Sequence, residues 1–190
     1  MSEILFTNAR LIDPVTLTDA PGWLRVAKGK IVESGDGKAP EAKGEVVDCG
    51  GLCLAPGIID IGVKVSEPGE RHKESFRSAA LAVRAGMTPE GALRAVTIAN
   101  ARMLGMEARV GTLETGKDAD FILLSGDPLS VYTEVEQTWV DGVKVFDLSD
   151  PTDRLYARGG PGAGENRRPP LCCFGSAWDI IMAANGGNGQ

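Results

Sequence analysis

The chain has 190 residues, 43% of them hydrophobic and 24% charged, which is typical of a globular domain with a buried core. Its net charge of -6 and pI near 4.9 disfavour nucleic acid and anionic membranes as partners, because both are bound through basic surfaces. No window approaches the roughly 20 apolar residues of a membrane span, so we expect a soluble, cytoplasmic protein.

The first third of the chain has the pattern of β-strands. An apolar run over residues 3–12 ends at an Asp-Pro turn, which predicts a strand followed by a turn. Residues 23–27 and 30–34 flank Gly29, whose freedom to adopt a positive φ favours a tight hairpin between them. Two further short strands are expected over residues 45–49 and 52–55.

The middle of the chain changes to helical spacing. Apolar residues three and four apart predict a first helix over residues 71–85, ending at Gly86. Thr88 before a proline predicts the N-cap of a second helix, which ends by Gly105 and has Asn100 as the candidate point of a break.

Strands return in the last part of the domain. Residues 120–125 form a compact apolar run, and residues 135–140 and 143–146 flank an Asp-Gly pair that strongly favours a hairpin. A short helix is expected over residues 152–157. We therefore divide the chain into a domain over residues 1–158 and a segment over residues 159–190 that begins as a Gly/Pro linker and ends in a short tail helix.

Four cysteines leave two interpretations open. Cys49 and Cys53 could meet Cys172 and Cys173 around a zinc ion, because thiolates at short spacing suit a tetrahedral site. The simpler alternative is that all four are reduced, mostly buried, small apolar residues. We expect no cofactor and keep zinc as the alternative.

Several motifs fall into two groups along the chain. The first group comprises residues 8–14, 55–60, 67–69 and 72–74. The second comprises residues 88–93, 111–124, 126–129 and 135–146. The first group resembles the dihydroorotase branch of the amidohydrolase superfamily, a lineage of hydrolases, and the second resembles its imidazolonepropionase-related branch. The junction falls between about Phe76 and Val83.

The resemblance implies a fold as well as a lineage. In these enzymes the N-terminal and C-terminal strands form one β-sandwich outside a catalytic barrel, and such a barrel needs roughly 200 residues or more. The two groups of motifs are almost contiguous here, so the barrel is largely missing. We predict an α+β fold, a small composite β-sandwich with two or three helices and no complete TIM barrel, whose barrel remnant spans about residues 54–104.

The resemblance also implies a metal site, which this sequence does not reproduce. The family's His-x-His ligands correspond to Gly62 and Lys64, and neither has a lone pair to offer, since glycine has no side chain and lysine is protonated. His72 is the only histidine, and Asp60 is more easily explained as a cap or structural acceptor. We assign no catalytic residue, and keep His72, Cys49, Cys53, Cys172 and Cys173 as candidate metal ligands.

Three functions remain open at this point. The first is a catalytically inactive protein with a role in assembly or binding, expected as a homo-oligomer because the apolar run from Ile58 to Val65 lacks neighbouring barrel strands, and with a protein partner as a further possibility. The second is a metal-dependent hydrolase acting on non-peptide C-N bonds. The third is a folded carrier that presents the tail over residues 159–190. A recombined or truncated gene product is also compatible with the sequence.

Overall fold

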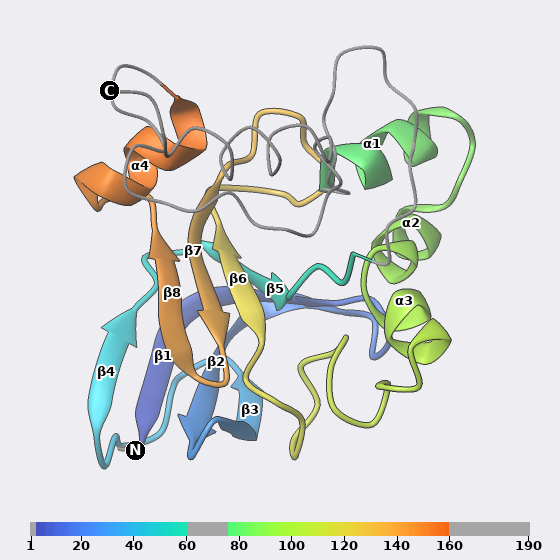
Figure 1. The fold of residues 1–190 in the computed structure, drawn as a ribbon. Helices are drawn as coiled ribbons and strands as arrows, with labels where there is room; N and C mark the ends of the chain where they lie inside the picture. Colours follow the sequence, from blue (N-terminus) through green and yellow to red (C-terminus); the bar gives the residue numbers. More distant parts are fainter. Residues whose placement is uncertain (1–2, 61–75, 160–190) are drawn as a thin grey trace, which may run out of the picture.

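The computed structural model describes residues 3–60 and 76–159, and within them one mixed sheet and four short helices form an α+β fold (Figure 1). No closed parallel barrel occurs in this described part, so the predicted fold class is confirmed. The strands are β1 (Ile4–Asp13), β2 (Thr18–Ala27), β3 (Lys30–Asp36), β4 (Glu45–Asp48), β5 (Cys53–Pro56), β6 (Phe121–Leu124), β7 (Val135–Val140) and β8 (Val143–Asp147). The helices are α1 (Phe76–Arg84), α2 (Pro89–Ala95), α3 (Ile98–Met103) and α4 (Pro151–Arg158).

The strand order joins the two halves of the sequence in one sheet. The order is β3-β2-β1-β5-β6-β7-β8, and β4 pairs with β1 beside this path. β1 is parallel to β4 near its start and to β5 near its end, whereas the other named pairs are antiparallel. The antiparallel β5–β6 pair is the direct link between the two halves.

The sheet curls so that its two halves pack face to face. Ile31 on β3 donates its amide to the Lys117 carbonyl at 2.9 Å and accepts from the Gly116 amide at 2.8 Å, so β3 touches the segment before β6. Between the halves, the Phe6 ring lies edge-on to both Phe121 and Trp139, with centroids 4.9 Å away in each case. This aromatic core accounts for the sandwich character that the sequence predicted.

The helices α1 to α3 form a layer at one side of the sheet (Figure 1). Ala79 and Ala92 from this layer share a second buried cluster with Ile122 and Leu124 of β6. Thr88 caps α2 as predicted, since its hydroxyl accepts from the Gly91 amide at 3.1 Å. Within the described residues, no helix is long and apolar enough to cross a membrane.

Two local expectations differ from the structure. The helical break falls at Thr97, not at Asn100, because Thr97 leaves helical geometry with φ −128° and ψ −101° while its hydroxyl donates to the Leu93 carbonyl. β2 begins at Thr18, five residues before the predicted start, because it pairs with β1 as far as Asp13. The expected helix at residues 152–157 is present as α4.

Candidate functional site

The chain leaves β5 through residues 57–60, where the expected first barrel strand would begin. Gly57 donates its amide to the Asp120 carbonyl at 3.0 Å, and Ile59 donates to the Val96 carbonyl at 3.0 Å. The buried Asn100 side chain donates to the Ile59 carbonyl at 2.6 Å. Residues 57–60 are therefore attached to Asp120, directly before β6, and to the α2–α3 junction, and these bonds connect the two groups of motifs.

The sequence-predicted ligand positions lie just beyond this anchored segment. Asp60 is exposed at its end. Gly62, Lys64 and His72 lie outside the described residues, as do Cys172 and Cys173. Among residues 3–60 and 76–159, no group of three or more His, Cys, Asp or Glu side chains could hold a metal ion.

The two described cysteines do not form a half-site. Both are reduced and buried, Cys49 in the aromatic core and Cys53 in the cluster under the helix layer. Burial raises the pKa of Cys49 to about 12, and burial also raises the pKa of Cys53 although Arg10 partly opposes it. The two thiols therefore belong to different clusters of the core and not to one shared site.

The motif at residues 111–124 is used to close the sandwich. Asp118 is buried and pairs with Lys30 on β3 and with Arg109, whose Nη2 lies 2.7 Å from Oδ2. Burial alone would raise the pKa of Asp118, but the hydrogen bonds from Lys30 and Arg109 outweigh it and lower that pKa. Its carboxylate is consequently held in the ionised form by the two cations, and it links β3 to the segment before β6.

A second buried carboxylate plays a similar part near the start of the chain. Asp13 accepts from the Val15 amide at 2.8 Å and from the Leu113 amide at 2.6 Å. Asp13 therefore joins the turn after β1 to the motif at residues 111–124. The predicted Asp-Pro turn is thus a cross-link between the N-terminal and C-terminal halves.

One surface cavity contains a charged cluster. It measures about 180 Å³ and is lined by Arg10, Asp19 and Asp127 together with residues of α2 and the β1–β2 turn. Arg10 donates to both Asp19 oxygens, at 2.6 and 2.7 Å, and Asp127 lies 3.5 Å from Arg10 Nη2. The hydrogen bond from Arg10 lowers the pKa of Asp19, so the pair stays ionised and mutually neutralised.

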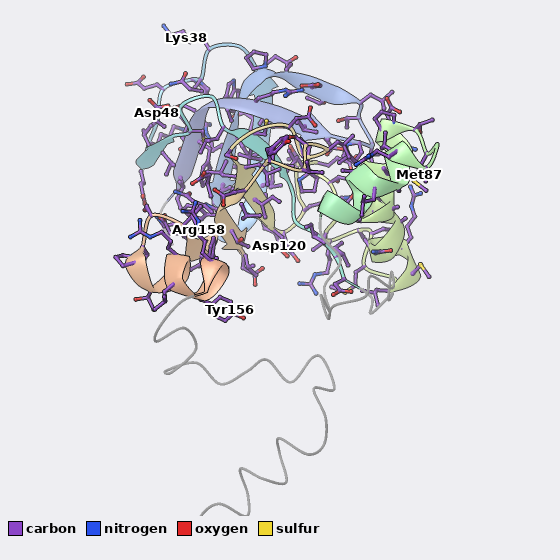
Figure 2. All side chains as sticks on the ribbon, turned by 90° about the horizontal axis from the view of Figure 1, so that it is seen from above. Lys38, Asp48, Met87, Asp120, Tyr156 and Arg158 are labelled. Atoms are coloured by element: carbon purple, nitrogen blue, oxygen red, sulfur yellow. The ribbon has the colours of Figure 1, made fainter. Side chains whose placement is uncertain are left out.

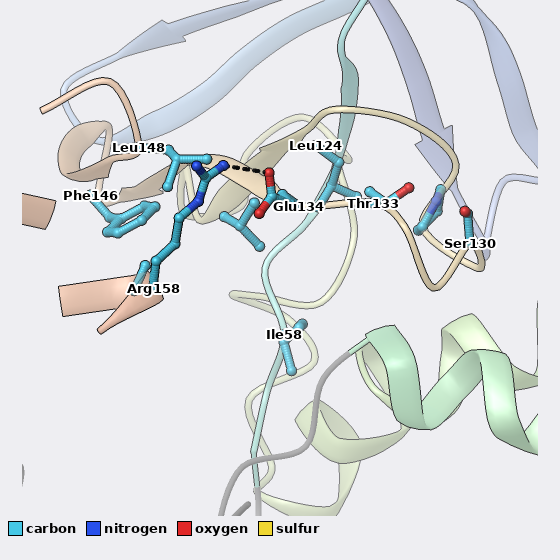
Figure 3. Close-up of a pocket in the computed structure, with 11 residues that line it drawn as sticks. Ile58, Leu124, Ser130, Thr133, Glu134, Phe146, Leu148 and Arg158 are labelled. Atoms are coloured by element: carbon cyan, nitrogen blue, oxygen red, sulfur yellow. Dashed lines mark hydrogen bonds and ion pairs between the residues drawn. The ribbon is translucent and has the colours of Figure 1, made fainter. Parts of the chain in front are cut away.

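A more apolar cavity lies between the β6–β7 loop, β8 and α4 (Figure 3). It measures about 230 Å³. Its apolar lining consists of Ile58, Leu124, Pro128, Val135, Phe146, Leu148 and Ala157. Ser130, Thr133, Glu134 and Arg158 supply the polar part, and Arg158 Nη2 donates to Glu134 Oε2 at 2.8 Å.

The loop that forms one wall of this cavity is held by its own hydrogen bonds. Thr133 donates its hydroxyl to the Asp127 carbonyl at 2.6 Å, and Ser130 donates its amide to the same carbonyl at 3.0 Å. Glu134 donates its amide to the Ser125 hydroxyl at 2.9 Å. The wall is therefore formed without a ligand.

Sequence reasoning did not single out this cavity. Its residues come from four separate parts of the chain, and no motif spacing links Ile58 to Arg158. The one local signal was the predicted short helix at residues 152–157, and the observed helix α4 extends one residue further and ends at Arg158. These parts of the chain meet only in the folded structure, so the sequence alone did not predict the cavity.

Comparison with known proteins finds similarity to amidohydrolases in part of the sequence and in the fold. Residues 62–147 match the model of the Amidohydrolase family. A dihydroorotase of Wolbachia sp. subsp. Drosophila simulans is 42% identical over 85 residues, which cover 44% of this chain and 19% of that protein. A dihydroorotase of Lactococcus lactis subsp. lactis is 38% identical over 117 residues, covering 62% and 26%. The matched part thus spans about a fifth to a quarter of these relatives.

The fold is also similar to that of a solved structure. An amidohydrolase from Thermotoga maritima MSB8 superimposes with a TM-score of 0.63 at 15% identity, covering 76% of this chain and 100% of that one. At this identity the likeness concerns the fold alone. The predicted resemblance to amidohydrolases is confirmed, while the predicted division between two branches stays a prediction.

Proposed function

We propose that this chain, which is similar to amidohydrolases in sequence and fold, is a catalytically inactive member of that superfamily with a role in assembly or binding. The observation that carries the proposal is the replacement of the two expected first-strand histidines by Gly62 and Lys64. A glycine has no side-chain donor atom, and a protonated lysine has no free lone pair. The family's metal-activated water would lack its first two ligands.

The surroundings of the described donors support the same proposal. Cys49 and Cys53 are buried thiols with raised pKa values, and Asp118 is neutralised by two cations. Burial of the two thiols and the ion pairs of Asp118 support a structural role for these groups. The polar residues of the family motifs support the sandwich instead.

An assembly role is supported by apolar residues on the helix layer. Leu81, Met87, Met103 and Leu104 are exposed there, and Met87 lies at the outer edge of the layer (Figure 2). The sequence that follows Ile59 continues as an apolar alternation through Val65. We propose a second copy of this chain as the occupant of this side, in a cytoplasmic homo-oligomer, because burial of exposed apolar side chains between identical subunits is the usual basis of a twofold interface.

A second candidate function is favoured by the relatives that are named dihydroorotases. It is a metal-dependent hydrolase of non-peptide C-N bonds, with zinc as the metal. A carrier of the segment over residues 159–190 is the third candidate, and deletion of that segment with unchanged partner binding would remove it.

Elemental analysis of the purified protein, combined with light scattering, tests the main proposal. We expect no stoichiometric zinc, no hydrolysis of dihydroorotate after zinc is added, and a mass of at least two chains. Zinc near one ion per chain, with turnover that a chelator abolishes, would establish the hydrolase instead. A monomeric mass would overturn the self-assembly role.

A further inference from the structure

We propose that the cavity between the β6–β7 loop, β8 and α4 binds a small carboxylate with an apolar body, of the size of benzoate or a short branched fatty acid. This inference concerns described residues only and does not depend on the proposed loss of catalysis. It rests on the shape, the lining and the charged rim of the cavity.

The apolar part of the cavity is suited to a compact hydrocarbon group. Leu124 and Val135 contribute from β6 and β7, and Phe146 and Leu148 contribute from the β8 side. An apolar cavity of about 150 Å³ is large enough for benzene, so the volume of about 230 Å³ has space for a ring and a carboxylate. Burial of the ring against these side chains is the source of affinity.

α4 covers this cavity without filling it. The helix has no fully buried residue. Two contacts nevertheless hold it in place, because Asp150 caps its N-terminus and Asp153 accepts from the amide of Asp147, the last residue of β8, at 2.9 Å. Figure 2 shows Arg158 on the side of α4 toward the sheet and Tyr156 on the opposite side. The helix is thus held over a space that its own side chains leave open.

The charged rim selects an anion. Arg158 contacts Glu134 through Nη2, and a guanidinium has five N–H groups in a fork that matches a carboxylate in two bonds. The Arg158 and Glu134 side chains are 54% and 46% exposed, so their pairing is screened by water and easily exchanged. Figure 3 shows the contact between Arg158 and Glu134. A bound carboxylate can therefore share or replace Glu134 on Arg158.

Removal of the charge of Arg158 and removal of the charge of Glu134 should change the affinity for benzoate in opposite directions. Arg158→Gln removes the partner of the ligand carboxylate, and we expect it to weaken benzoate binding about tenfold or more. Glu134→Gln removes the competing anion, and we expect tighter binding. Arg154→Gln, on the same helix but outside the cavity lining, removes the same charge and should change the affinity less than twofold.

The experiment is an amide-shift titration of the full chain with benzoate and with neutral benzyl alcohol. We expect saturable shifts at cavity residues and tighter binding of benzoate than of benzyl alcohol. Ala157→Trp fills the space from an exposed helix position, so we expect it to abolish the binding of both ligands. The proposal is overturned if benzoate produces no saturable shifts at the cavity. It is equally overturned if Arg158→Gln and Arg154→Gln behave alike, because the rim would then not select the anion.

Discussion

Asp118 and Lys30 form an ion pair across 88 residues of sequence, and this contact joins the edge of β3 to the segment before β6. Arg109 holds the second oxygen of the same carboxylate, at 2.9 Å from Nε and 2.7 Å from Nη2. The carboxylate is buried, whereas both cations reach solvent. The contact between the two halves of the sheet therefore includes one buried carboxylate, Asp118, which forms ion pairs with the partly exposed Lys30 and Arg109.

Asp118→Asn should lower the free energy of unfolding by roughly 2–3 kcal/mol, since charge-assisted hydrogen bonds contribute about that much and the amide replaces an acceptor by a donor facing two cations. Urea denaturation at pH 7 measures the change. Asp36→Asn, at an exposed position on β3, is the matched control and should stay within about 0.5 kcal/mol of the unchanged protein. Equal losses in both variants would remove the special role of Asp118.

The same pair gives an acid dependence of stability. The pKa of Asp118 is lower in the folded protein than in the unfolded chain, so its contribution is complete above the unfolded value near 4 and is lost as the pH falls through the folded value. We expect the stability difference between the unchanged protein and Asp118→Asn to be constant from pH 5 to 7 and to shrink below about pH 4. A difference that grows on acidification would contradict this assignment.

Two glycines with almost the same backbone geometry separate conformational strain from crowding. Gly37 has φ +71° and no atom within 4 Å of the place that a Cβ would take, whereas a Cβ at Gly142, with φ +70°, would lie 2.8 Å from Val26 Cγ1. Gly37→Ala should cost about 1 kcal/mol through left-handed strain alone. Gly142→Ala should cost about 2–4 kcal/mol, because overpacking against the buried Val26 adds to the same strain. Thermal unfolding of the two variants measures the difference. Equal losses in the free energy of unfolding would show that the β7–β8 hairpin shifts enough to relieve the crowding at Gly142.

Local signals in the sequence predicted those parts of the fold that local physics decides. The hairpin around Asp141 and Gly142 was predicted from its turn, and the Thr88 cap was predicted from one hydroxyl before a proline. The first five residues of β2 were missed because their pairing with β1, and not their composition, makes them a strand. The same reason hides the cavity, since its walls meet only after the sheet and α4 have packed.

Burial should protect both described cysteines from alkylation. With the pKa of Cys49 raised to about 12, its reactive thiolate is scarce at pH 8, and Cys53 is shielded beneath the helix layer. We expect iodoacetamide to leave both unmodified in the native protein and to modify both in urea, as read by peptide mass mapping. Added zinc should not alter this pattern. Rapid native labelling of either residue would contradict its burial in the folded protein.

Asn100 is the side chain that fastens residues 57–60 to the helix layer, and its removal should loosen that segment before it unfolds the domain. Asn100→Ala leaves the Ile59 carbonyl without its 2.6 Å donor, at a cost of roughly 1–2 kcal/mol. The neighbouring bond from the Ile59 amide to the Val96 carbonyl should open more often, so hydrogen exchange at Ile59 should accelerate more than exchange in β6. Arg102→Ala, at an exposed position of α3, is the control and should leave both rates unchanged. If exchange accelerates equally at Ile59 and in β6, Asn100 supports the whole domain and does not act on this segment in particular.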